Sequence, residues 1–87
     1  MSTATIRYWA AARDAAGTAE ESYEAATLAE MLDHARDRHG FDERFVAVLS
    51  YCSFLVDGTP VGARSTGSVE LRDGMTVEAL PPFAGGC

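Results

Sequence analysis

The chain has 87 residues and a mass of 9.3 kDa, and 47% of its residues are hydrophobic, which suits one domain with one core. Thirteen acidic residues against seven basic ones give a formal net charge of −6. This balance argues against nucleic-acid binding, which rewards a basic surface. It permits a protein partner with a basic docking face, although the ordinary acidity of a small domain explains the charge more simply.

The sequence gives no sign of a membrane segment or a metal site. No apolar run reaches spanning length, and Arg7, Arg13 and Asp14 stand where a signal peptide would carry its apolar stretch. We therefore expect a cytoplasmic protein whose thiols stay reduced. Two cysteines without CxxC spacing and two histidines predict no metal site.

The first predicted element is a strand over residues 5–9, where β-branched and aromatic residues alternate with others. The alternation directs Ile6 and Tyr8 to the core and Trp9 outward. Residues 10–16 tolerate a helix but are few, so we predict a turn there. Gly17 closes this turn, and a second strand follows near residues 21–25.

The main predicted helix covers residues 27–39. Thr27 and Glu30 match a capping box, in which hydroxyl and carboxylate satisfy backbone N–H groups at the helix start. Apolar residues then recur along one helical stripe at Leu28, Met31, Leu32 and Ala35. Gly40 suits a left-handed residue that ends the helix.

The second half of the chain alternates short strands with turns. Residues 41–50 are ambiguous and fit a short helical segment packed on the core. Residues 52–56 predict a strand, and Asp57-Gly58 predicts a hairpin turn into a return strand at 59–61. Pro60 lacks an N–H and confines that return strand to a sheet edge. A polar loop, a short extended piece and a turn then lead to the last strand at 76–80.

These elements predict an α+β fold. The compact arrangement at this size is the β-grasp, with one main helix on a mixed sheet of four to five strands. Residues 1–80 would form the domain and residues 81–87 an extended C-terminal tail. The chain shows no repeat or linker.

The tail has an unusual composition for a chain end. Proline has a fixed φ and no N–H, so Pro81 and Pro82 keep the tail out of the sheet and extended. Gly85 and Gly86 have no side chains and can enter a narrow channel. Fully extended, the tail reaches about 20–25 Å, far enough to place a carboxylate in a partner's active site.

The chain carries no catalytic set of its own. It has no Ser-His-Asp arrangement and no Gly-rich phosphate loop, and we expect solvated or capping roles for His34 and His39. A terminal glycine carboxylate is instead suited to activation by another enzyme, as a mixed anhydride with AMP. The sequence therefore predicts a protein that is acted upon rather than an enzyme.

Three stretches resemble one family. IRYWAAARDAAG, CSFLVDGTPVG and LRDGMTVEALPPFAGG are similar to the MoaD/ThiS ubiquitin-like sulfur carriers, and within them to small subunits of molybdopterin synthase. The resemblance implies that an E1-like adenylating enzyme of MoeB type uses ATP to adenylate Gly86, with no cofactor bound by the carrier. A persulfide then converts the adenylate into a thiocarboxylate. The tail donates this sulfur, inside the large synthase subunit of MoaE type, to cyclic pyranopterin monophosphate.

The resemblance also implies an apolar docking surface beside the tail. By alternation, Trp9 and Leu80 face away from the core on neighbouring strands. Phe83 and Pro60 would extend that surface. The docking and reach of the tail would come from the segment between the last strand and the glycines, namely Pro81, Pro82, Phe83 and Ala84.

Cys87 departs from the family pattern, because active carriers end at the second glycine. While Cys87 is attached, Gly86 is an amide and cannot be adenylated. We favour a precursor trimmed by a JAMM-type metallopeptidase over a persulfide carried on Cys87 itself, since a persulfide site needs no di-glycine. Cys52 is expected to face inward as a small buried hydrophobic residue.

Other functions remain open at this stage. A trimmed carrier could supply sulfur to cysteine or to a secondary metabolite, with thiamin less favoured by the PPFAGG ending. A ubiquitin-like modifier would join Gly86 to a target lysine. A plain interaction module would have an inert tail.

Overall fold

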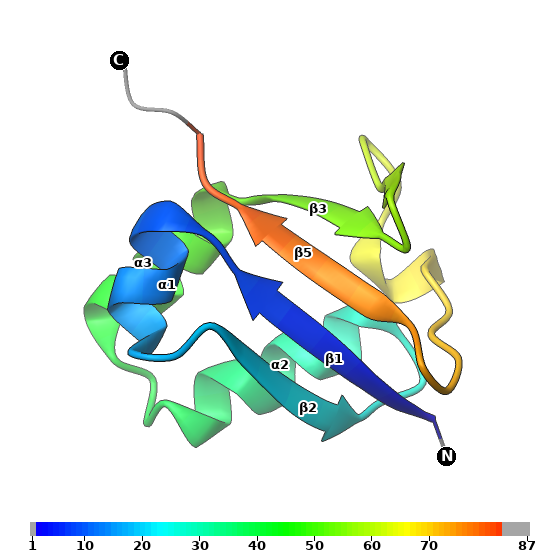
Figure 1. Cartoon of the computed structure of the whole chain (residues 1–87), viewed down its shortest axis with the longest axis horizontal. Helices are drawn as coiled ribbons and strands as arrows, with labels where there is room; N and C mark the ends of the chain where they lie inside the picture. The colour runs from blue at the N-terminus through cyan, green and yellow to red at the C-terminus, as the bar shows by residue number, and fades with distance from the viewer. Residues whose placement is uncertain (1, 83–87) are drawn as a thin grey trace.

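The computed structural model describes residues 2–82 of the protein (Figure 1). Five strands form one mixed sheet in the order β2-β1-β5-β3-β4. β1 and β5 are parallel neighbours in the centre, and the other pairs are antiparallel. The strands are β1 Thr3–Tyr8, β2 Glu20–Glu24, β3 Ser53–Val56, β4 Thr59–Pro60 and β5 Thr76–Leu80. The helices are α1 Ala10–Ala16, α2 Leu28–Arg38, α3 Glu43–Tyr51 and the short 3₁₀ helix η1 Thr66–Ser68.

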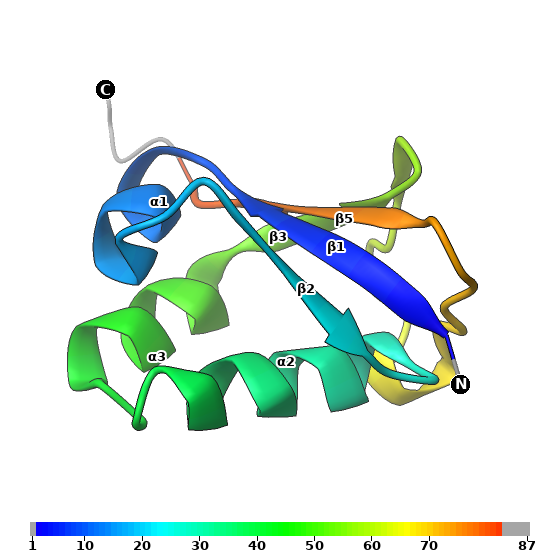
Figure 2. The same cartoon turned by 60° about the horizontal axis from the view of Figure 1, so that its bottom comes forward.

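The three α-helices leave one face of the sheet open. Figure 2 shows α2 lying beneath the sheet, with α1 and α3 near the end from which β5 exits. The core fills the space between sheet and helices, and its largest fully buried side chains are Phe45, Ile6, Leu28, Met31 and Val77. We call the opposite, uncovered side of the sheet the outer face.

Helix α2 begins as its sequence predicts. The hydroxyl of Thr27 accepts a hydrogen bond of 3.2 Å from the Glu30 N–H. The Glu30 carboxylate reaches back to the Ala26 N–H at 2.9 Å, one residue before the expected partner. Gly40 follows the helix with φ of 63°, the left-handed conformation that glycine adopts readily.

α2 is the main helix, as predicted, and two shorter α-helices accompany it, of which only α1 was not expected. Residues 10–16 form α1 rather than a turn, and Gly17 ends this helix with φ of 75°. α1 packs against α3, so tertiary contact stabilises a segment too short to be helical alone. α3 occupies the ambiguous stretch, and the Asp42 side chain caps it by accepting from the Phe45 N–H at 3.0 Å.

The strands lie close to their predicted positions. β1 begins two residues earlier than expected and ends at Tyr8, so Trp9 lies just beyond it as the residue that precedes α1. Asp57 and Gly58 have φ of 48° and 84° and make a two-residue hairpin turn with positive φ at both positions. Pro60 lies in the edge strand β4, as its missing N–H predicts.

A cluster around Glu21 joins β2 to α2 and the core. The Glu21 side chain is only 7% exposed, and its carboxylate accepts hydrogen bonds from the Tyr8 and Tyr23 hydroxyls, both at 2.7 Å. His39 Nε2 lies 2.9 Å from the same carboxylate, and the His39 ring stacks on Phe45. His39 therefore ends α2, in the capping position expected of it, while its side chain packs inside rather than being solvated.

Candidate functional site

The root of the C-terminal tail lies at the exit of the central strand β5. Leu80 pairs with Ser53 of β3, and the Trp9 N–H donates to the Ala79 carbonyl at 3.2 Å from the other side. Pro81 is buried, whereas Pro82 is exposed. The chain is therefore held on both sides up to Leu80, and the roles of Pro81 and Pro82 in docking and reach stay predictions.

The predicted reactive end lies beyond the part of the chain that the structure describes. Phe83, Ala84, Gly85, Gly86 and Cys87 are outside the described residues. Their expected roles in docking, clearance, sulfur loading and processing stay predictions. Figure 1 shows that the described chain reaches this point at the end of the sheet opposite the N-terminus.

The outer face carries apolar side chains next to the tail root. Across the sheet, Trp9, Leu80 and Ser53 follow one row, because the Trp9 N–H continues the β1–β5 register. The neighbouring row runs from Arg7 through Glu78 to Leu55 and Pro60. We define the outer-face patch as the apolar members of these two rows, namely Trp9, Leu55, Pro60 and Leu80.

Leu55 belongs to this patch in the structure but was not among the docking residues predicted from the sequence. The signal for it was present, since Cys52, Phe54 and Val56 point inward and strict alternation then turns Leu55 outward. Leu55 is half-buried and pairs directly with the exposed Pro60 of the edge strand. The structure thus brings together the predicted residues Trp9, Pro60 and Leu80 with one additional leucine.

Trp9 is exposed yet held in place. Its side chain is 41% exposed, and its indole Nε1 donates a hydrogen bond of 3.1 Å to Glu78 Oε1. The Arg7 guanidinium lies 5.2 Å from the indole centroid and is itself 3.6 Å from the Glu20 carboxylate. Ala10 follows with φ of 48°, a conformation that costs a non-glycine residue about 1–2 kcal/mol and turns the chain into α1.

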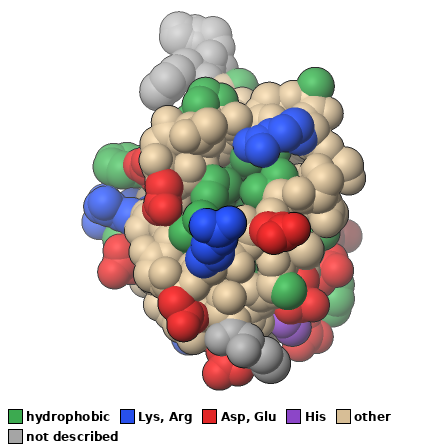
Figure 3. Space-filling view, turned by 90° about the vertical axis from the view of Figure 1, so that its right-hand side faces the viewer, with side chains coloured by type: hydrophobic (Ala, Val, Ile, Leu, Met, Phe, Trp, Pro, Cys, Tyr) green, Lys and Arg blue, Asp and Glu red, His purple; other side chains and the backbone are tan. Residues whose placement is uncertain are grey.

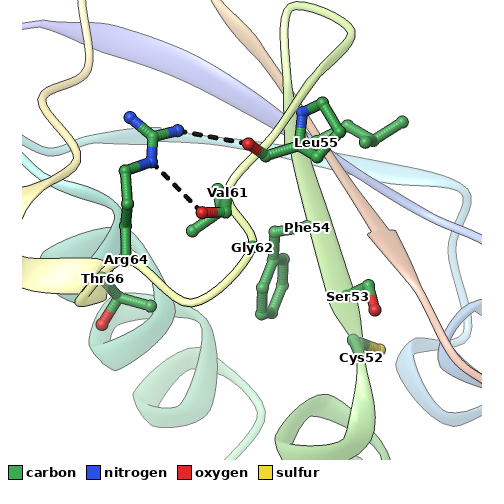
Figure 4. A pocket seen from close by; sticks show the side chains of 9 residues that line it. Cys52, Ser53, Phe54, Leu55, Val61, Gly62, Arg64 and Thr66 are labelled. Atoms are coloured by element: carbon green, nitrogen blue, oxygen red, sulfur yellow. Dashed lines mark hydrogen bonds between the residues drawn. The ribbon is translucent and has the colours of Figure 1, made fainter.

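A hollow of about 340 Å³ opens beside the patch, between β3 and the loop after β4 (Figure 4). Leu55 and Pro60 belong to its lining as well as to the outer-face patch. Arg64 fastens the loop, with its Nε donating to the Val61 carbonyl at 3.2 Å and its Nη2 to the Pro60 carbonyl at 3.4 Å. The Arg64 guanidinium donates to these backbone carbonyls and holds the loop in place. We therefore assign Arg64 a structural role in the hollow rather than a catalytic one.

The neighbouring surface is charged and shallow. Arg64, Arg72 and Glu70 contribute to a second hollow there, and Figure 3 shows basic and acidic side chains around small hydrophobic areas on this side. Within residues 2–82, no group of three or more His, Cys, Asp or Glu side chains could hold a metal ion. Among the described helices, none is long and apolar enough to cross a membrane.

Cys52 packs inward, as expected, although it is half-buried rather than fully buried. Its side chain contacts the core, and its Sγ donates to the Val48 carbonyl at 3.3 Å. Burial raises the pKa of the Cys52 thiol to about 11. The thiolate is therefore scarce at neutral pH, and Cys52 is a poor nucleophile in the folded protein.

The parallel central pair β1–β5, its antiparallel flanks and the helix packed on one face define a ubiquitin-like β-grasp protein. This confirms the predicted fold class. The chain belongs to the ThiS family, whose model matches residues 6–86, from β1 to the second terminal glycine. Members of this family are small ubiquitin-like sulfur carriers and are not enzymes themselves.

Solved structures show the same fold. The small archaeal modifier protein 1 from Methanosarcina acetivorans aligns with a TM-score of 0.82 and 20% identity, over 99% of this chain and 98% of that one. A putative molybdopterin converting factor subunit 1 from Pyrococcus furiosus aligns with a TM-score of 0.75 and 24% identity, over 94% and 99%. A Helicobacter pylori complex of subunits 1 and 2 of molybdopterin-converting factor gives a TM-score of 0.66 and 19% identity, over 97% and 99%. No curated protein sequence matches this chain.

Proposed function

We propose that this protein is the sulfur-carrying small subunit of a molybdopterin synthase and acts in the cytoplasm. The observation that carries the proposal is the family match, which extends over the whole domain and through the di-glycine to residue 86. The described structure supports it, because β5 ends at one edge of the apolar outer-face patch. A partner that docks on this patch would therefore meet the tail at its root.

The proposed chemistry takes place at the carboxylate of Gly86. A carboxylate is a poor electrophile, so an E1-like enzyme of MoeB type joins it to AMP at the expense of ATP. A persulfide sulfur then attacks the acyl carbon, AMP leaves, and reduction of the acyl disulfide by a second thiol releases the thiocarboxylate. The softer sulfur is a better nucleophile than oxygen and passes to cyclic pyranopterin monophosphate. The carrier leaves with a carboxylate and can be charged again.

The proposed partner surface is the outer-face patch. A large subunit of MoaE type would cover Trp9 and Leu80 while the tail enters its active site. The Helicobacter pylori complex of subunits 1 and 2 supports a partner of this kind, since its chain shares this fold. Trp9 is suited to the role of anchor, because aromatic side chains that lose their contact with water contribute strongly to binding.

Cys87 makes the proposed protein a precursor. A peptidase of JAMM type would remove it and expose the Gly86 carboxylate. The mature carrier then needs residues 1–86 alone, which is also where the family match ends.

The proposal is tested by reconstitution. Residues 1–86, made with a thiocarboxylate at Gly86, are mixed with the organism's large subunit and cyclic pyranopterin monophosphate. We expect molybdopterin to form with this chain, and none with residues 1–87. Equal yields from the two chains, or no product from either, would contradict the proposed role.

A second function is favoured by the fold match to the small archaeal modifier protein 1. In that case Gly86 would form an isopeptide bond with a lysine of another protein. The last basic residue before the tail is Arg72, so trypsin would leave residues 73–86 attached to each modified lysine. Mass spectrometry of tryptic digests from native cells would detect this remnant. Its presence on many proteins would favour the modifier over the sulfur carrier.

A further inference from the structure

The basic residues of this chain are all of one kind. Its seven Lys and Arg residues are the arginines at positions 7, 13, 36, 38, 44, 64 and 72, so no side chain carries a primary amine. The guanidinium group stays protonated and is not an acyl acceptor under physiological conditions. A lysine amine, in contrast, attacks activated acyl groups once it loses its proton.

The thiol of Cys52 is also a poor acyl acceptor. Cys52 is half-buried, contacts the core and donates its S–H to the Val48 carbonyl. Because the thiolate is the reactive form of cysteine, the raised pKa of about 11 keeps this sulfur inert near neutral pH.

The buried carboxylate of Glu21 forms hydrogen bonds with two tyrosines and one histidine. The Tyr8 and Tyr23 hydroxyls both donate to it, and His39 Nε2 lies within hydrogen-bond distance. Burial and the Glu21 carboxylate raise the pKa of Tyr8 above the ordinary phenol range and that of Tyr23 to about 12. These three side chains are therefore poor acyl acceptors in the folded protein.

We propose that the carrier does not acylate its own side chains: it donates its activated acyl group and offers neither a side-chain amine nor a reactive internal thiol to accept one. In the reaction avoided, a nucleophile attacks the Gly86 carbonyl carbon, a new acyl bond forms, the bond to AMP or sulfur breaks and the nucleophile loses a proton to solvent. This inference rests on the proposed activation of Gly86.

The absence of lysine also limits how copies of this protein could be joined to one another on a target protein. A modifier is extended into chains when the next copy joins a lysine of the previous one. This chain presents no lysine to the next copy, so lysine-linked chains of the modifier cannot form, and the α-amino group is the one amine that the next copy could join. At high concentration, carriers with an activated Gly86 would likewise not acylate one another's side-chain amines, so the activated group would remain available to the partner.

The test uses chemically activated protein, so that no activating enzyme is needed. Residues 1–86 are prepared with a thioester at Gly86 and an acetylated α-amine, and are incubated in concentrated solution at mildly alkaline pH. Intact mass spectrometry should show the thioester and its hydrolysed acid, and no species of twice the chain mass. A self-acylated species joined through any side chain of the parent protein would overturn the proposal.

The matched control is a variant that introduces lysine side chains in place of arginines and so keeps the net charge. Arg13 and Arg44 are exposed on α1 and α3, so we expect the double variant Arg13→Lys/Arg44→Lys to keep the fold. We expect this variant to accumulate the species of twice the chain mass, linked at the new lysines. Its failure to do so would also overturn the inference, since lysine would not be the missing acceptor. Either result leaves the role of Gly86 in sulfur transfer standing, because the thioester bypasses enzymatic activation.

Discussion

The indole of Trp9 and the carboxylate of Glu78 join the loop after β1 to the central strand β5, through a hydrogen bond of 3.1 Å on the outer face. Glu78 lies two residues before Leu80, the last residue of the strand that leads to the tail. The exposed aromatic ring is thereby fixed relative to the tail root. Such preorganisation reduces the conformational entropy lost when a partner binds.

Replacement of Trp9 should weaken binding of the large synthase subunit. We expect Trp9→Ala to reduce the affinity by about 2 kcal/mol, the value typical of a central aromatic anchor, with little change in stability. Isothermal titration with the large subunit measures this change. Phe41→Ala is the matched control, because Phe41 is 61% exposed in the loop between α2 and α3. Equal affinities for the Trp9 and Phe41 variants would contradict the docking role of the outer-face patch.

Glu21 should make the fold sensitive to acid. Burial alone would raise the pKa of this carboxyl, but hydrogen bonds from Tyr23, His39 and Tyr8 outweigh burial and hold the pKa below its ordinary value of 4.5. The ionised carboxylate therefore contributes stability above pH 4.5, and this contribution is lost as the pH falls through the lower folded pKa.

The variant Glu21→Gln removes this titration. We expect a loss of about 1–3 kcal/mol in the free energy of unfolding at pH 7, since charged hydrogen bonds are replaced by neutral ones. The difference from the parent protein should shrink in acid. Urea denaturation at several pH values measures both, with Glu24→Gln on the same strand as an exposed control. A loss that stays constant with pH would contradict the role given to the Glu21 charge.

Asp57 should stabilise the β3–β4 hairpin in two ways. It has φ of 48°, and its Oδ1 accepts a hydrogen bond of 2.8 Å from the Thr76 N–H. We expect Asp57→Ala to cost about 1–2 kcal/mol, since alanine tolerates positive φ poorly and cannot accept the bond. Asp57→Asn should stay within about 0.5 kcal/mol of the parent, because Asn-Gly is a preferred hairpin turn. Equal thermal stability of the two variants would show that neither effect operates.

Cys52 should resist thiol reagents in the folded protein. The shift of its pKa from 9.0 to about 11 lowers the thiolate fraction near neutral pH by roughly a hundredfold. In residues 1–86, where Cys52 is the remaining cysteine, iodoacetamide labelling at pH 7.5 should be correspondingly slow and should accelerate in urea. Labelling at the rate of a free thiol peptide would show that the sulfur is accessible.

Elements with strong local signals were predictable from the sequence. The helix over 27–39 carries its own capping residues and apolar stripe, and Asp57-Gly58 dictates its turn whatever surrounds it. α1 lacks such signals. It has no side-chain cap, buries only Ala12 and depends on packing against α3, which lies far along the chain.

For the candidate site, the outward direction of individual strand residues was predictable, but contacts between distant elements were not. Alternation in β1 and β5 was enough to place Trp9 and Leu80 outward, and it also places Leu55 outward once the inward residues of β3 are fixed. The Glu21 cluster was not predictable, because Tyr8, Tyr23 and His39 come from three elements that meet only in the folded protein. The bond between Trp9 and Glu78 likewise depends on the register of two distant strands.

The account depends on sulfur being carried at Gly86, and the intact mass of the protein isolated from its native cells tests this most directly. We predict a chain that has lost Cys87 and in which one oxygen is replaced by sulfur. A chain that keeps Cys87 and carries one added sulfur would contradict the account, because the sulfur would then be a persulfide on the cysteine.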